Sequence, residues 1–422
     1  MLKGARSGLT LLPRNGFARN IGILTGGTAA AQAVTVLALP LLTRLYAPSD
    51  FGLLASYMAL VSVASVIGCL RYNIAIPLPE TDADGAALLM ASLLASTAIG
   101  LLAALPVLAM PGQVAAVLGQ PALAAMLWMV PVSIWAASLY NALQYWASRR
   151  KRFAQVARTR VERSVGGTAV QVGLGWAGTG AFGLLLGQTA NNALGTLSLA
   201  RPAWREDREP LRSIDVARLR RVAATYRRFP LFSVPETLFN TAGVQVPILI
   251  IAALAAPSDA GLLFLAMRVM GLPMGLVGTS VAQVYLAEAP ARLRAGTLTA
   301  FTDRTMRALL KVGAAPLILV GIAAPFAFPI LFGAEWARAG ALVAWMTPWF
   351  VLQFVASPIS VVLHVTNRLG AALALQLAGL ALRLAAVLGA FVLTPDLVME
   401  VYAVSGAVFY LLYLGVIRAG LR

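Results

Sequence analysis

The sequence predicts an all-α polytopic membrane protein with about twelve transmembrane helices in two six-helix lobes. Three observations support this prediction. Apolar residues make up 59% of the 422 residues and charged residues only 12%, against roughly 25% charged in a soluble domain. Apolar runs recur along the whole chain and are long enough to cross a bilayer as helices. Matching segments also recur in the two halves of the chain at one constant offset.

The twelve predicted spans follow directly from the apolar runs. The fifth and sixth spans are the hardest to separate, because glycines recur at the end of the fifth. In chain order the spans cover approximately residues 20–43, 51–79, 86–110, 121–147, 164–178, 180–200, 230–256, 260–288, 306–332, 338–365, 370–394 and 397–417.

The basic residues predict the orientation of these spans. Of the 33 Lys and Arg residues, 28 fall in alternate connections and at the two ends of the chain. This asymmetry predicts that both termini are cytoplasmic, since cytoplasmic loops carry the excess of Lys and Arg. The net charge of +17 is therefore interpreted as a topology signal, and nucleic acid is not an expected partner. The cytoplasmic stretches are 1–19, 148–163, 201–229, 289–311, 366–369 and 418–422.

These stretches divide the chain into two lobes and their connections. Residues 20–200 form the N-terminal lobe, residues 230–417 the C-terminal lobe, and residues 201–229 a basic cytoplasmic linker. Residues 1–19 and 418–422 are the terminal segments. Because six spans precede the linker, the halves enter the membrane in the same direction, as in a parallel repeat. The linker either anchors the chain at the anionic leaflet or attracts anionic headgroups as a gate.

An internal repeat supports the two-lobe division. Residues 47–54 return as residues 256–263 with seven of eight positions identical, an offset of 209. Residues 143–148 align with residues 352–357 at the same offset. A serine or aspartate in each copy of the first segment is expected to cap the helix that follows. The alternatives are Ser49 or Asp50 in the first copy, and Ser258 or Asp259 in the second.

Polar side chains inside the spans are candidates for a cavity. In the first span Thr25, Thr28, Gln32 and Thr35 share one helical face. A polar face in a membrane faces a cavity or other helices, so cavity lining and interhelical hydrogen bonding both remain open. The offset of 209 also pairs positions in the first and seventh spans and in the fourth and tenth. The candidate cavity residues are Thr28, Gln32, Thr237, Asn240, Thr241, Gln144 and Gln353.

Charged residues inside spans are a second group of candidates. Arg71, Arg268 and Arg383 lie inside predicted spans, where a guanidinium is costly and has either a function or an escape route. For Arg71 and Arg383, substrate contact and snorkelling to the interface are the two alternatives. Arginine forks match phosphate oxygens, which favours a lipid headgroup carrying pyrophosphate. Arg44 lies at the outer end of the first span, either as an exit residue or as an interfacial anchor. Glu236 is a candidate site for proton or sodium coupling.

The remaining side chains argue against an enzyme. The chain has a single cysteine, Cys69, and a single histidine, His364, so no histidine–cysteine metal cluster is expected. No glycine-rich nucleotide loop is present. The predicted outer loops are too short for an external catalytic platform. We therefore expect a transporter without a cofactor.

The N-terminal motifs resemble those of polysaccharide flippases. Residues 20–28 with Gln32, then Pro40-Leu41-Leu42-Thr43-Arg44-Leu45-Tyr46-Ala47-Pro48-Ser49-Asp50-Phe51-Gly52, are similar to the start of this family. Leu70-Arg71-Tyr72-Asn73-Ile74-Ala75-Ile76-Pro77-Leu78-Pro79 continues the resemblance, although the family commonly has glutamate in place of Asn73. These flippases belong to the multidrug/oligosaccharidyl-lipid/polysaccharide exporter superfamily.

The resemblance implies an activity and its partners. It implies a bacterial inner-membrane flippase for polyprenyl-pyrophosphate-linked oligosaccharide in O-antigen, capsule or exopolysaccharide assembly. A polysaccharide polymerase and a chain-length regulator are the implied protein partners. Related flippases need arginines in a central cavity, and by position in the fold Arg71 and Arg268 are the nearest candidates. The alternatives are a cation-coupled multidrug antiporter of the same superfamily and, from a different class, a polytopic polysaccharide polymerase or ligase.

Overall fold

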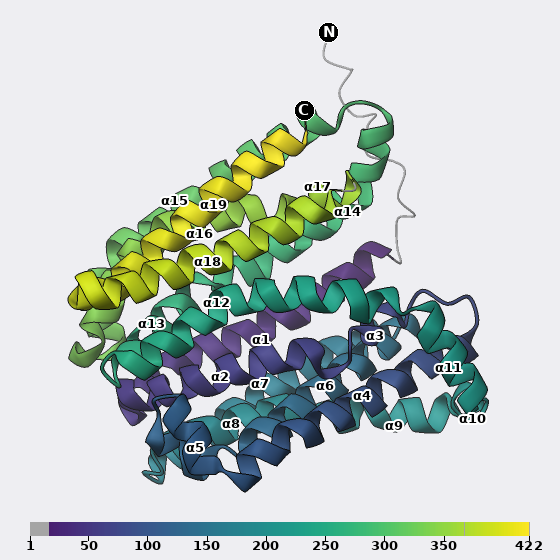
Figure 1. The fold of residues 1–422 in the computed structure, drawn as a ribbon, viewed down its shortest axis with the longest axis horizontal. Helices are drawn as coiled ribbons and strands as arrows, with labels where there is room; N and C mark the ends of the chain where they lie inside the picture. Colours follow the sequence, from purple (N-terminus) through teal and green to yellow (C-terminus); the bar gives the residue numbers. More distant parts are fainter. Residues whose placement is uncertain (1–16, 367, 422) are drawn as a thin grey trace.

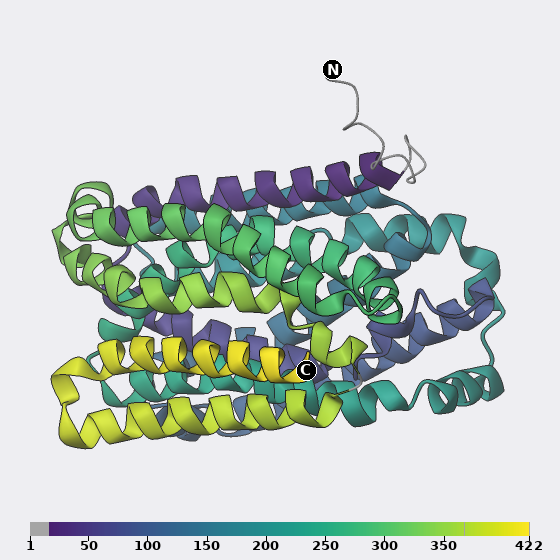
Figure 2. The same cartoon turned by 90° about the horizontal axis from the view of Figure 1, so that it is seen from above.

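The chain folds into a bundle of helices that run side by side (Figures 1 and 2). The computed structural model describes residues 17–366 and 368–421, without the side chains of residues 17–21, 212, 276, 279, 280, 283, 287, 364 and 369. Most of the predicted N-terminal segment, residues 1–16, lies outside the described residues.

The first half of the chain forms one group of helices, seen in purple to teal in Figure 1. Its helices are α1 (Phe17–Leu45), α2 (Pro48–Gly68), α3 (Tyr72–Ala75), α4 (Asp82–Ala109), α5 (Pro111–Val117), η1 (Pro121–Met126), α6 (Met129–Arg149), α7 (Phe153–Trp176) and α8 (Ala181–Ala193). Three short helices then lead to the second half: α9 (Thr196–Glu206), α10 (Arg208–Arg212) and α11 (Val216–Thr225).

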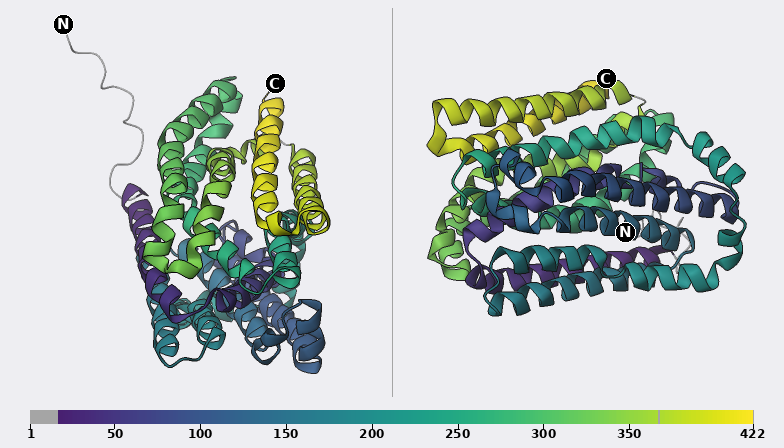
Figure 3. Two further views of the ribbon diagram at one scale, coloured as in Figure 1. Left: turned by 90° about the vertical axis from the view of Figure 1, so that its left-hand side faces the viewer. Right: turned by 60° about the horizontal axis from the view of Figure 1, so that its bottom comes forward.

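The second half forms the other group, from teal to yellow, and the two groups are also distinct in Figure 3. It begins with a π-helical turn, η2, that continues directly into α12. Its elements are η2 (Phe229–Ser233), α12 (Val234–Leu254), α13 (Asp259–Met270), η3 (Met274–Gly278), α14 (Thr279–Arg294), α15 (Leu298–Phe332), η4 (Ala334–Trp336), α16 (Ala337–Ile359), α17 (Val362–Val365), α18 (Leu369–Leu393), η5 (Pro395–Leu397) and α19 (Val398–Gly420).

The predicted fold class is confirmed. Eight helices in the described part of the chain are long and apolar enough to cross a membrane. Four more segments run lengthwise beside them: α6, α7, α8 with α9, and α13 with η3 and α14 (Figure 1). Together these segments make the twelve passes that the sequence predicts. We call the end of the bundle that holds α9–α11 and Gly420 the linker end, and the opposite end the turn end.

The structure separates the fifth and sixth passes where the sequence left their boundary open. Helix α7 ends at Trp176 and α8 begins at Ala181. Gly178 and Gly180 lie between them with φ of 70° and 56°, a left-handed backbone that glycine adopts without steric cost. The fifth pass also begins earlier than predicted, at Phe153 instead of residue 164. The basic residues of this stretch therefore lie on a helix.

A buried carboxylate fixes the start of the linker to the N-terminal lobe. The Asp207 side chain is fully buried and accepts a hydrogen bond from Trp146 Nε1 at 2.9 Å. Arg152 pairs with the same carboxylate at 2.7 Å, and Arg150 pairs with it at 3.0 Å. A buried charge is tolerated only when it is paired and hydrogen-bonded in this way. Asp207 therefore neutralises two of the basic residues next to α6.

The repeated segment caps a helix in each lobe, and aspartate is the residue that does so. Asp50 Oδ2 accepts a hydrogen bond from the backbone N–H of Ala47 at 3.1 Å. Asp259 Oδ2 accepts one from the backbone N–H of Ala256 at 3.3 Å. Each carboxylate thus reaches back to a backbone donor at the start of its helix. Of the two alternatives in each copy, the aspartate makes this hydrogen bond, whereas Ser258, the N-cap residue of α13, makes no side-chain capping bond.

The two copies of this segment also meet each other at the turn end. A Cβ on Gly52 would collide with the carbonyl oxygen of Pro257, and a Cβ on Gly261 would collide with that of Pro48. The two contacts are equivalent, because Gly261 follows Gly52 by 209 residues and Pro257 follows Pro48 by the same offset. Glycine is required at both positions, since only a residue without a side chain allows such close backbone approach. The lobes meet here and spread apart toward the linker end (Figure 1).

Gly52→Ala is expected to open the turn end without unfolding the protein, because the added methyl group collides with Pro257. Spin labels at the exposed Ala47 and Ala256, in a Cys69→Ser background, would report a longer interlobe distance. The control is Gly112→Ala, since a Cβ at Gly112 meets no atom within 4 Å. Equal label distances in the two variants would contradict this role of Gly52.

Candidate functional site

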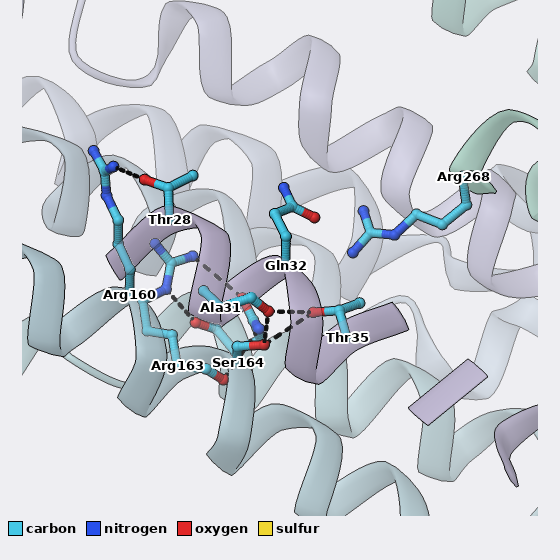
Figure 4. A pocket seen from close by; sticks show the side chains of 9 residues that line it. Thr28, Ala31, Gln32, Thr35, Arg160, Arg163, Ser164 and Arg268 are labelled. Carbon is cyan, nitrogen blue, oxygen red and sulfur yellow. Dashed lines mark hydrogen bonds between the residues drawn. The ribbon is translucent and has the colours of Figure 1, made fainter. Parts of the chain in front are cut away.

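A pocket of about 220 Å³ lies between the first helix, α7 and the second half of the chain (Figure 4). We call it the α1–α7 pocket. Its walls are polar and cationic, with side chains from α1, α7, α8 and α13. The lining residues are Thr28, Ala31, Gln32, Thr35, Arg160, Arg163, Ser164, Asn191 and Arg268.

The wall between α1 and α7 is held by close packing and hydroxyl hydrogen bonds. Gly27 packs so tightly on Ala157 that a Cβ at residue 27 would not fit. Ser164 Oγ donates to the carbonyl oxygen of Ala31 at 2.7 Å and lies 2.9 Å from Thr35 Oγ1. Small and hydroxyl-bearing residues allow membrane helices to approach in this way. The polar face predicted on the first span is therefore partly packing contact and partly pocket wall.

Two arginines of α7 point into this wall. Arg160 Nη1 donates a hydrogen bond to Thr28 Oγ1. Arg163 lies over the Tyr140 ring, 4.0 Å from its centroid, and its Nε donates to the carbonyl oxygen of Asn191 at 2.6 Å. These contacts fix both side chains before any ligand is bound. Preorganised guanidinium groups are well suited to hold an anion.

Arg268 reaches the same pocket from the other lobe. It extends from α13 toward α1, with its guanidinium directed at the face that carries Gln32 (Figure 4). Arg268 forms no ion pair and no hydrogen bond with the residues that the structure describes. The lining contains three arginines and, within the described residues, no carboxylate. An anion is the ligand that this electrostatic environment favours.

A second pocket, of about 400 Å³, lies at the linker end. We call it the α12 pocket. Arg71 enters it from the turn between α2 and α3, and its Nε donates to Ser233 Oγ of η2 at 3.2 Å. Arg71 and its neighbour Leu70 both have a left-handed backbone, with φ of 61° and 47°. The lining residues are Arg71, Arg228, Phe229, Phe232, Ser233, Glu236 and Thr237.

The predicted cavity residues are thus divided between two pockets. Thr28, Gln32 and Arg268 line the α1–α7 pocket, whereas Arg71, Thr237 and Glu236 line the α12 pocket. Six other candidates line neither of them. Arg44 and Asn240 are exposed, Thr241, Gln144 and Gln353 are half-buried, and Arg383 is buried.

Arg383 has a contact inside the C-terminal lobe that explains its burial. Pro247 in α12 has no N–H, so the carbonyl oxygen of Gly243 one turn earlier lacks its helical partner. Arg383 Nη1 donates to this oxygen at 3.1 Å. The guanidinium lies 4.5 Å from the centroid of Phe409 and 5.3 Å from that of Trp349, within cation–π range. Arg383 therefore holds α18 against the proline-interrupted turn of α12.

Sequence reasoning missed Arg160, Arg163, Ser164 and Asn191. The arginine-rich stretch from 148 to 163 predicts a loop, which places Arg160 and Arg163 outside a span and Ser164 at the first position of one. A signal was present in the spacing. Arg160, Arg163, Ser164 and Gly167 follow the i, i+3, i+4, i+7 pattern of one helical face.

The described residues do not form a metal centre of clustered ligands. Among the described residues, no group of three or more His, Cys, Asp or Glu side chains lies together as metal ligands would. The polar groups of both pockets are mainly donors, and cations are held by oxygen, nitrogen or thiolate acceptors.

The two helical lobes, the long apolar helices and the polar pockets between them define a multi-pass membrane protein. A family model described as polysaccharide biosynthesis protein matches residues 41–341. The chain belongs to this family. No curated protein is significantly similar to the chain in sequence.

The fold is also similar to that of multidrug transporters of known structure. A MATE in complex with MaL6 is 13% identical with a TM-score of 0.64, and the match covers 96% of each chain. An outward-facing multidrug resistance MATE transporter of the MOP superfamily is 12% identical with a TM-score of 0.62, over 95% of this chain and 94% of the other. An inward-facing one is 14% identical with a TM-score of 0.54, over 94% of each. At these identities the likeness shows the fold alone.

The contact between Arg383 and Gly243 predicts a coupling between Arg383 and Pro247. Arg383→Met is expected to destabilise the protein by about 1–3 kcal/mol, because a buried carbonyl loses its donor. In a Pro247→Ala background the loss should be smaller, since Ala supplies the helical N–H that proline lacks. Unfolding of the four proteins of this double-mutant cycle in detergent measures the coupling.

Pro316→Ala in α15 is the control background for this cycle, because Pro316 interrupts a different helix. There the cost of Arg383→Met should equal its cost in the unmodified chain. Additive effects of Arg383→Met and Pro247→Ala would show that Arg383 does not support this turn.

Proposed function

We propose that the chain moves polyprenyl-pyrophosphate-linked oligosaccharide from the inner to the outer leaflet of a bacterial cytoplasmic membrane. The observation that carries this proposal is the α1–α7 pocket, where three arginines meet with no carboxylate among the described lining residues. The family supports a role in polysaccharide biosynthesis, and O-antigen, capsule or exopolysaccharide units are the proposed cargo.

The pocket's chemistry suits the headgroup of such a lipid. Guanidinium forks bind phosphate oxygens with paired, charge-assisted hydrogen bonds. In the low-dielectric surroundings of a membrane protein, an arginine without a counter-charge favours an anion more strongly than it would in water. Gln32 and Asn191 add amide groups that can hydrogen-bond sugar hydroxyls. The polyprenyl tail would stay in the lipid outside the bundle.

Alternating access of the two lobes is the proposed mechanism. The basic segments support an orientation with the linker end toward the cytoplasm, and the lobes touch through Gly52 and Gly261 at the opposite end. We therefore assign the structure to a state closed to the outside, from contacts of this chain's own residues. Arg268 belongs to one lobe and Gln32 to the other. Rocking of the lobes would consequently change the shape of the pocket that holds the headgroup.

The driving force follows from the charge of the cargo. An inside-negative membrane potential moves an anion outward with about 2.3 kcal/mol per charge per 100 mV. Proton or sodium coupling through Glu236, a residue of the α12 pocket, is the alternative source of energy. Transport into vesicles with an imposed potential, or with an imposed ion gradient, separates the two.

A cation-coupled multidrug antiporter is the second candidate, and the MATE fold favours it. Such a transporter binds cationic drugs and needs acidic side chains in its cavity. Glu236 in the α12 pocket is the one carboxylate among the described lining residues of the two pockets. Drug resistance conferred on a pump-deficient strain, with no effect on surface polysaccharide, would favour this candidate over the flippase.

Arg268→Gln is expected to abolish surface polysaccharide while leaving the amount of protein in the membrane unchanged. The arginine has no partner among the described residues, so its loss breaks no internal contact. The measurement is complementation of a deletion strain, with lipid-linked oligosaccharide quantified on the inner leaflet.

Arg158→Gln is the matched control, because Arg158 is exposed on α7 and pairs with Glu162 at 2.7 Å outside the pocket. It should complement fully. Normal polysaccharide in the Arg268→Gln strain would contradict the proposed function.

A further inference from the structure

We propose that the α12 pocket is a second binding site, which takes the phosphate headgroup of an amphiphile from the surrounding lipid. The identity of the natural ligand rests on the proposed function, whereas the chemistry of the site follows from the residues of the pocket. It shares no lining residue with the α1–α7 pocket. The two pockets can therefore hold separate molecules.

The charges of the α12 pocket favour an anion. Arg71 of the N-terminal lobe and Arg228 at the end of the linker line the pocket with one carboxylate, Glu236, so the positive charge exceeds the negative charge. Two guanidinium groups that line one pocket can both bind a phosphate there, each through paired hydrogen bonds. Arg71 is half-buried, and a guanidinium of this kind is more effective than one in bulk water.

The backbone around Arg71 indicates that its position is enforced. Leu70 and Arg71 are two consecutive non-glycine residues with positive φ, a conformation that side chains disfavour. Such strain persists only where the surrounding structure holds it, and it clusters at ligand sites and switches. Here the turn brings Arg71 across to Ser233 of the other lobe. The π-helical form of η2 is likewise frequent at functional sites.

The apolar side of the pocket indicates that the anion belongs to a lipid. Phe229 and Phe232 line the pocket beside the two arginines. Phe232 is 71% exposed and its neighbour Leu231 is 61% exposed, so this wall continues onto the surface of the bundle. Exposed apolar side chains on a membrane protein face lipid tails. A cationic wall joined to a lipid-facing apolar wall fits a headgroup whose tail remains in the bilayer.

The pocket also lies where a headgroup would first meet the protein. It is formed at the linker end, between the α2–α3 turn and the start of α12. In the proposed orientation this end lies at the inner leaflet, where the flippase must collect its substrate. The α12 pocket would then load the amphiphile, and the α1–α7 pocket would hold it during the rocking of the lobes.

The test uses the full-length protein in neutral detergent and farnesyl pyrophosphate as the probe. Arg268→Gln is the background, because it weakens the α1–α7 pocket, which keeps Arg160 and Arg163, and so increases the share of binding that the α12 pocket contributes. In this background Arg228→Gln is expected to weaken binding at least tenfold. Arg227→Gln is the matched control, since the adjacent exposed arginine does not line the pocket. It should leave binding unchanged.

Glu236→Gln is expected to change the affinity for farnesyl pyrophosphate in the opposite direction to Arg228→Gln. Misfolding would weaken binding and cannot produce this result. Removing the pocket's negative charge should tighten binding of farnesyl pyrophosphate severalfold. Farnesol and inorganic pyrophosphate, each tested alone, should bind more weakly than the complete amphiphile. Equal affinities in the Arg227→Gln and Arg228→Gln proteins would overturn the site. Inorganic pyrophosphate that binds as tightly as farnesyl pyrophosphate would overturn the lipid assignment.

These results are independent of the proposed function. The binding experiment requires no translocation, whereas the function is tested by surface polysaccharide in cells. A chain that fails to restore polysaccharide can still bind farnesyl pyrophosphate through Arg228. The opposite outcome is also distinct. If the unmodified chain restores polysaccharide but Arg228→Gln does not weaken binding of farnesyl pyrophosphate, the proposed function stands and only the second site is wrong.

Discussion

The reciprocal contact of two glycines with two proline carbonyls is the constraint on which the arrangement of the lobes depends. Gly52 lies against Pro257, and Gly261 lies against Pro48, at the point where α2 and α13 begin. Because the backbones themselves touch, no change of side-chain rotamer can relieve or loosen this contact. The ring of Phe51 meets that of Trp336 at 5.0 Å between centroids beside it. The indole of Trp336 donates in turn to the carbonyl oxygen of Thr43 at 3.2 Å.

The consequence of this contact is a bundle closed at one end and wider at the other. Helix α2 packs on both α12 and α13 of the other lobe, so it is the main connection between the halves. Toward the linker end the same helix ends in the strained turn that carries Arg71. The tight contact at one end of α2 and the Arg71–Ser233 hydrogen bond at the other lie on one rigid element. A movement that separates the lobes at one end must therefore act on the other.

Much of the fold could be predicted from the sequence, because membrane helices and repeats have strong local signatures. The offset of 209 correctly related Asp50 to Asp259, and the apolar runs gave twelve passes. The start of α7 could not be predicted from local charge. Arg160 and Arg163 look like residues of a basic loop, and only their tertiary contacts with Thr28, Tyr140 and Asn191 show why they are stable on a helix.

The division of the site into two pockets has a geometric reason. A parallel repeat places equivalent positions on opposite sides of a pseudo-two-fold axis. Thr28 and Thr237 are therefore equivalent without being neighbours, and each lines a different pocket. Register shows which positions correspond, but not which of them face a common space. Which positions face a common space depends on how the two lobes are rotated relative to each other. The glycine contact constrains this rotation, whereas the polar pattern does not.

The distribution of acidic residues explains why the pockets are cationic. Asp207 pairs with Arg150 and Arg152, and Asp82 with Arg149 and Arg150, all outside the pockets. Within the described residues these carboxylates neutralise arginines that hold helices and linker together. Among the residues that the structure describes, Arg268 has no such partner. If this uncompensated charge served packing alone, its desolvation would destabilise the protein and no favourable interaction would offset it. A ligand that carries negative charge into the α1–α7 pocket offsets that cost, and this is the physical reason for the anionic headgroup that we propose as its ligand.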